Sequence, residues 1–132
     1  MTLALSLVVW SLILAFVQII LFDMVRTGQY GLKWNTGARD ETDLPALSAL
    51  GGRLKRAQDN LFETLPLFIA AVLVAHVTHR ETDMVTLGAE IWFGARIVYL
   101  PLYAFGVQQL RSLVWLVSIA GLGMIVAPLV MP

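Results

Sequence analysis

The sequence of 132 residues contains no cysteine and few charged side chains. Without cysteine, disulfides, thiolate metal sites and a cysteine nucleophile are excluded, so any thiol chemistry must come from a substrate. Charged residues make up 14% of the chain, compared with about 25% in ordinary soluble domains, whereas 58% of the residues are hydrophobic. This composition indicates a membrane protein.

An excess of charge of one sign is also missing, because nine basic residues balance nine acidic ones. Net charge therefore gives no reason to expect nucleic acid as a partner. The sequence has no Gly-rich phosphate loop and no Ser-His-Asp pattern. His76 and His79 could share one helix face, but only Glu81 or Asp83 could supply a third ligand, so no metal site is expected.

Four hydrophobic runs are each long enough to cross a bilayer, whose core of roughly 30 Å needs about 20 helical residues. They predict membrane spans over residues 3–22, 59–78, 84–105 and 113–131. The last two connections are short, so the helices that they join are antiparallel neighbours. The predicted fold is an all-α, integral membrane, up-down four-helix bundle that forms one domain over residues 1–132. In the fourth span, Gly123 and Ala127 beside Gly121 favour close helix contact.

The long first connection, residues 23–55, is predicted to be a loop with at most a short helix. Basic residues identify its side of the membrane. Seven of them lie on the side of the first and third connections, one (Arg80) lies on the other, and Arg96 lies inside the third span. The seven are Arg26, Lys33, Arg39, Arg53, Lys55, Arg56 and Arg111. Positive charge favours the cytoplasm, which predicts a cytoplasmic long loop and both termini on the opposite side.

A polar stripe begins the second span. Arg56, Asn60 and Glu63 are spaced i, i+4 and i+7, so in a helix they fall within about 60° of one another. A span that starts near Asp59 carries Asn60 and Glu63 into the membrane, where polar groups need partners or a function. For Arg56 and Asn60, a solvated or helix-anchoring role is the alternative to ligand contact.

The third span carries a second polar face, made of Arg96, Tyr99 and Tyr103. An arginine near mid-span costs on the order of 3 kcal/mol, so Arg96 must be compensated. Glu63 on the neighbouring helix is one candidate partner, in a structural ion pair, and the carboxylate of a ligand is the other. Arg111 and Ser112 place a cation and a hydroxyl at the start of the fourth span, where a positive-inside anchor is the alternative reading.

These polar residues resemble the motifs of a known family. Residues 56–66 read R-A-Q-D-N-L-F-E-T-L-P, which resembles the R-A-x-x-N-x-x-E…P signature on the second helix of the MAPEG family, the membrane-associated proteins of eicosanoid and glutathione metabolism. Residues 95–99 resemble its A-R-x-x-Y pattern, Arg111-Ser112 its R-S pair, and the four spans with a long first loop its topology. The resemblance covers nearly the whole chain.

The resemblance implies a homotrimer that binds glutathione, as substrate or cofactor and without a metal, between neighbouring subunits. It places Arg56, Asn60 and Glu63 in the cradle for the tripeptide, and Arg96, Tyr99 and Tyr103 in the third-helix wall. It also places Arg111 and Ser112 at the thiol, as catalytic residues. A free thiol titrates near 8.5, and an adjacent arginine lowers that pKa and increases the fraction of thiolate.

The implied activity is that of a glutathione transferase or peroxidase that acts on lipophilic electrophiles. Its partners are further copies of the chain, membrane lipids and a lipophilic small molecule. The resemblance is to a bacterial-type member, which implies the bacterial inner membrane. Trp115 stands where several catalytic members have tyrosine, and Gly31 where some have arginine. The alternative is a non-enzymatic membrane protein or assembly subunit that keeps the trimeric scaffold.

Overall fold

The computed structural model describes residues 1–131, in which all regular structure is helical. The helices are α1 (Leu3–Tyr30), α2 (Leu32–Thr36), α3 (Ala49–Val77), α4 (Asp83–Ala104) and α5 (Gln108–Val130). Four of them, α1, α3, α4 and α5, are long and apolar enough to cross a membrane. The prediction of an all-α membrane bundle with four spanning helices is therefore confirmed.

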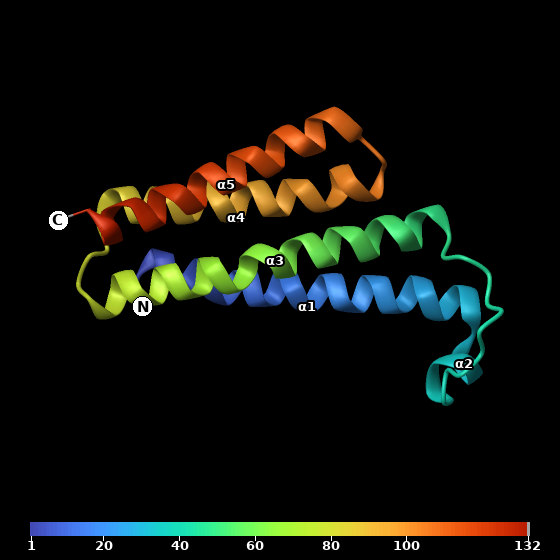
Figure 1. The fold of residues 1–132 in the computed structure, drawn as a ribbon. Coiled ribbons are helices and arrows are strands. Elements are labelled where there is room, and N and C mark those ends of the chain that lie inside the picture. Colours follow the sequence, from blue (N-terminus) through green and yellow to red (C-terminus); the bar gives the residue numbers. More distant parts are fainter. Residues whose placement is uncertain (132) are drawn as a thin grey trace.

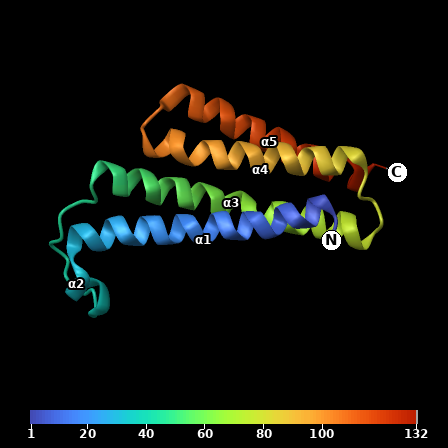
Figure 2. The same cartoon turned by 180° about the vertical axis from the view of Figure 1, so that it is seen from behind.

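The four long helices run alternately up and down, so the molecule has two distinct ends (Figure 1). We call one the terminal end, where both termini and the α3–α4 turn (residues 78–82) lie. We call the other the loop end, which holds α2, the connection over residues 37–48 and the α4–α5 turn (residues 105–107). The same arrangement is seen from behind in Figure 2.

Hydroxyl side chains define where three of the long helices begin. Thr2, Ser48 and Thr82 each accept a hydrogen bond from the backbone N–H three residues later, which satisfies one of the unpaired donors of a helix start. α1 ends at Gly31, whose φ of 95° is accessible at little cost only to glycine. These local signals therefore fix the boundaries of the first connection.

The helices extend further at the loop end than the predicted spans. α1 continues to Tyr30 and α3 begins at Ala49, so much of the predicted loop 23–55 is helical. The reason is that a hydropathy window marks the part of a helix that fits the hydrocarbon core. Outside that part, the helix continues wherever the sequence favours it, as in the polar start of α3 after its Ser48 cap.

The core lies between the α1–α3 layer and the α4–α5 layer. α3 and α4 contact each other and both outer helices, whereas α1 and α5 do not touch within residues 1–131. Phe68 of α3 and Trp92 of α4 are fully buried and stacked, with ring centroids 3.9 Å apart. Since α3 and α4 are both central, polar residues on their facing sides are enclosed by the bundle.

Two glycines allow α4 and α5 to approach closely toward the terminal end. A Cβ atom on Gly88 would lie 2.6 Å from the carbonyl oxygen of Gly121, a distance that no side chain tolerates. Gly123, which the sequence pattern paired with Ala127, faces open space, with no heavy atom within 4 Å of an added Cβ. The expected close contact is therefore present, but Gly121 makes it and Gly123 does not.

Candidate functional site

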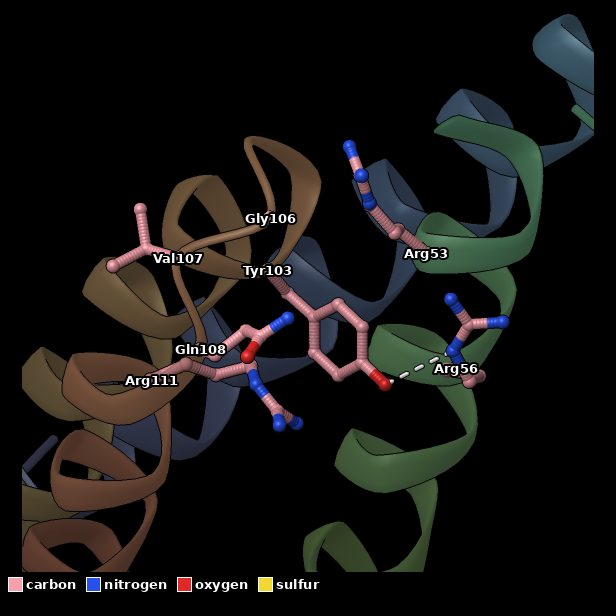
Figure 3. Close-up of a pocket in the computed structure, with 7 residues that line it drawn as sticks. All are labelled: Arg53, Arg56, Tyr103, Gly106, Val107, Gln108 and Arg111. Atoms are coloured by element: carbon pink, nitrogen blue, oxygen red, sulfur yellow. Dashed lines mark hydrogen bonds between the residues drawn. The ribbon is translucent and has the colours of Figure 1, made fainter. Parts of the chain in front are cut away.

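A cavity of about 260 Å³ opens at the loop end, between α3 and the α4–α5 turn (Figure 3). Three of its lining residues are arginines and one is a tyrosine. The lining consists of Arg53, Arg56, Tyr103, Gly106, Val107, Gln108 and Arg111.

The helices and the turn together position these side chains. Arg53 and Arg56 are three residues apart on α3, so they lie on one face of that helix. Gly106, with φ of 75°, closes the turn after α4, and an added Cβ there would lie 3.0 Å from Cζ of Arg53. The turn thus brings Tyr103 and Arg111 to face the two arginines of α3.

Tyr103 occupies the centre of the cavity, with Arg53 and Arg56 on one side and Arg111 on the other (Figure 3). Its hydroxyl oxygen accepts a hydrogen bond from Nε of Arg56 at 3.1 Å. Cζ of Arg111 lies 4.5 Å from the centroid of the Tyr103 ring, in cation–π contact. Among residues 1–131 this hydroxyl donates no hydrogen bond, so its proton is available to a ligand.

The three arginines have no anionic partner among residues 1–131. The ion pairs there are Arg26–Asp23, Lys55–Asp59 and His76–Glu81. Three guanidiniums around one cavity repel one another, and each presents planar N–H donors that suit a carboxylate. The cavity is therefore electrostatically suited to an anionic ligand that carries carboxylate groups.

Arg96 lies deeper in the bundle and does not line this cavity. Its two terminal nitrogens donate to Oδ1 of Asn60 and to Oγ1 of Thr64, both at 2.6 Å, and its side chain is fully buried. The expected ion pair with Glu63 is wrong. Asn60 and Thr64 are four residues apart and share the face of α3 that meets α4, whereas Glu63, about 60° from Asn60 and about 100° from Thr64 around the helix, is exposed and forms no ion pair within residues 1–131.

Tyr99 connects the buried group to the cavity. Cζ of Arg96 lies 5.3 Å from the Tyr99 ring, and the Tyr99 and Tyr103 rings meet edge to face at 5.6 Å. The predicted site residues therefore form two groups. Arg56, Tyr103 and Arg111 line the cavity, and Asn60, Arg96 and Tyr99 lie behind it.

Ser112 lies outside both groups. Its side chain is exposed, and its hydroxyl donates to the carbonyl oxygen of Gln108 within α5 at 3.4 Å. Arg53, by contrast, lines the cavity although the sequence analysis did not include it in the site. The signal was its position three residues before Arg56, which places both on one helix face.

Residues 7–131 match the model of the MAPEG family. This match covers the whole bundle except the first few residues of α1 and its cap. The chain belongs to the MAPEG family. No individual curated protein sequence matches it. As a MAPEG protein with four spanning helices, it is a multi-pass membrane protein.

The terminal end of this MAPEG protein arranges its charges differently. Glu81 accepts hydrogen bonds from the Thr2 hydroxyl at 2.7 Å and from His76 at 3.0 Å. Burial alone would raise the pKa of Glu81, but the hydrogen bonds from His76 and Thr2 and the charge of His76 together lower that pKa below 4.5. Arg80 donates to the carbonyl groups of Leu129 and Met131 at the end of α5.

Within residues 1–131, no three His, Asp or Glu side chains are close enough to share a metal ion. The chemistry of the cavity described above is that of arginine and tyrosine donors. Its geometry favours the binding of an anion and the stabilisation of negative charge on it.

Proposed function

We propose that this MAPEG protein binds glutathione in the loop-end cavity and uses its thiolate to attack lipophilic electrophiles, as a transferase or a peroxidase. The observation that carries the proposal is the set of three arginines around Tyr103 without a carboxylate partner among residues 1–131. Glutathione supplies the missing anions, because the tripeptide has two carboxylates and a thiol that ionises.

The arrangement supports a separate role for each donor. Arg53 and Arg56 bind the carboxylates of the tripeptide by charge-assisted hydrogen bonds. Arg111 lies across the cavity and favours the thiolate, because a nearby cation lowers a thiol pKa from about 8.5. The O–H of Tyr103, whose oxygen accepts from Arg56, donates to the bound anion.

In the transferase reaction, the sulfur of the thiolate forms a bond to the electrophilic carbon and the leaving group departs with its electron pair. In the peroxidase reaction, the sulfur takes the outer oxygen of a hydroperoxide and an alcohol leaves after protonation. A second glutathione then converts the sulfenic acid to the disulfide and water. Both reactions use the same stabilised thiolate.

The residues behind the cavity act through Tyr103. Arg96, fixed by Asn60 and Thr64, packs against Tyr99, and Tyr99 packs against Tyr103. We propose that this group orients the central tyrosine. The catalytic role of Ser112 stays a prediction, since its hydroxyl forms its hydrogen bond within α5. The role of Glu63 in the cradle for the tripeptide stays a prediction as well.

We also propose that the protein is a homotrimer in a bacterial inner membrane, with the loop end in the cytoplasm. The excess of basic residues at the loop end supports this orientation. Glu63 supports the assembly, because it is exposed at membrane depth and has no ion pair among residues 1–131. A polar interface between copies would give the Glu63 carboxylate polar neighbours instead of lipid. The mass of the purified particle, corrected for detergent, tests the trimer.

Calorimetric titration of the detergent-purified protein with glutathione tests the function. We expect binding, and we expect Arg53→Gln and Arg56→Gln each to raise the Kd about tenfold or more through loss of a charge-assisted hydrogen bond. Lys55→Gln is the matched control, since Lys55 pairs with Asp59 and does not line the cavity. No binding by the wild type, or equal weakening in Lys55→Gln, would overturn the proposal.

The alternative role as an assembly subunit predicts a different pattern. One observation favours it: Trp115, at the position where several catalytic members of the family have tyrosine, cannot act as a general acid, and its buried indole N–H has no partner among residues 1–131. In that case the wild type binds no glutathione, and truncation of Glu63 or Arg96 dissociates the particle.

A further inference from the structure

Glu90 is a carboxyl group at membrane depth that has no ion-pair partner among residues 1–131. It lies seven residues after Asp83, the first residue of α4, or about 10 Å along the helix at 1.5 Å per residue. Its side chain is exposed, and it forms no ion pair among residues 1–131. Glutamate is too short to reach water from that depth, so an unpaired carboxylate there is costly and points to a function.

Glu90 belongs to an open groove between α4 and α5. The groove has a volume of about 320 Å³, and all of its other lining residues are apolar. The lining consists of Glu90, Ile91, Gly94, Ala95, Val98, Val114 and Val117. At Gly94 an added Cβ would meet nothing within 4 Å, so the groove is unfilled there. Small-molecule sites have volumes from about 300 Å³ upward.

No basic side chain of this protein reaches the level of Glu90. With one exception, the lysines and arginines lie at the loop end or in the α3–α4 turn, and the two histidines lie in the last turn of α3 and in that α3–α4 turn. The exception, Arg96, has 1% of its surface exposed and is bonded to Asn60 and Thr64. A second copy that crosses the membrane in the same direction has the same distribution. The cation that complements Glu90 must therefore come from another molecule.

We propose that this groove binds an amphiphile with a protonated amine head and a hydrocarbon chain. The ammonium group pairs with Glu90, and the chain lies along the apolar walls from Ile91 to Val98, a helix length of about 10 Å. The loop-end cavity shares no lining residue with the groove and is lined by arginines, which repel a cation. The groove is therefore a second site that does not depend on glutathione binding.

Native mass spectrometry of the full protein in a neutral detergent tests the proposal. The probes are dodecylamine and its neutral analogue dodecanol. We expect the wild type to bind the amine about tenfold more tightly than the alcohol, and Glu90→Gln to lose that preference. Asp83→Asn removes another exposed carboxyl group of α4, outside the groove, and is expected to keep the preference.

A second variant tests the groove independently of its charge. Gly94→Leu fills the groove, and leucine is a better helix former than glycine, so we expect a folded protein that binds both probes more weakly. Equal binding of amine and alcohol by the wild type would overturn the proposal, as would an amine preference that survives in Glu90→Gln. If the wild type binds no amine and Glu90→Gln dissociates the particle, Glu90 serves a contact between copies and the proposal is wrong.

Discussion

The two ends of the bundle both contain basic side chains, but only the loop end gathers several arginines around one cavity. At the terminal end, Arg80 donates to the last carbonyl groups of α5, and Glu81 is bound by Thr2 and His76. At the loop end, Arg53, Arg56 and Arg111 surround a cavity without a carboxylate partner among residues 1–131.

This difference between the two ends distinguishes polar groups that stabilise the fold from polar groups that are available to a ligand. A helix end leaves carbonyl groups without partners; Arg80 donates to those at the end of α5, and Arg53 donates to the carbonyl oxygen of Ala104 at the end of α4 at 3.4 Å. At the loop end the cations face one another across a tyrosine, which is unfavourable until an anion binds. Residue type alone does not distinguish these roles, whereas the partners of each side chain do.

Removal of one arginine from each end gives the largest expected contrast. Arg111→Ala is expected to lower kcat/KM for conjugation of glutathione to an activated aryl chloride about 100-fold, because a donor to the developing thiolate is lost. Arg80→Ala is expected to leave the rate within about twofold, since Arg80 lies at the other end. Steady-state assays at matched protein concentration measure both. Equal rates for the two variants would remove the functional distinction between the ends.

Helix packing provides the second contrast. Gly88→Ala is expected to destabilise the protein by about 1–3 kcal/mol, because its Cβ would meet the backbone of Gly121. Gly123→Ala is the matched control on α5, where the added Cβ meets nothing and helix propensity improves. Thermal unfolding in detergent, followed by circular dichroism, compares them. Equal midpoints would contradict the close approach of α4 and α5.

The smallest expected effect concerns acidity at the terminal end. The pKa of Glu81 is lowered in the folded protein, so the ionised carboxylate stabilises the fold. This stabilisation is present above about pH 4.5 and is lost as the pH falls through the lower folded-state pKa. The wild type should therefore unfold at a higher temperature than Glu81→Gln near neutral pH, and the difference should shrink on acidification below pH 4.5. A difference that does not depend on pH would assign the effect to packing.

Much of the fold could be predicted because membrane spans are encoded locally. The hydrophobic runs gave the four spanning helices, and the short connections gave their antiparallel order. The helix ends at Tyr30 and Ala49 lay outside the predicted spans, since hydropathy measures insertion and not the length of a helix. Among the site residues, Arg56 was found from its spacing, and Arg53 was missed although it shares the same face of α3.

The sequence by itself determined the membrane character, the four spanning helices and the family motifs, because these depend on composition and on spacing along one helix. Only the tertiary structure decided which partner each polar side chain has. Arg96 bonds to Asn60 and Thr64 instead of Glu63 because the rotation of α3 about its own axis selects the face that meets α4. Helix rotation is set by packing against neighbouring helices, and no single segment of the sequence records it.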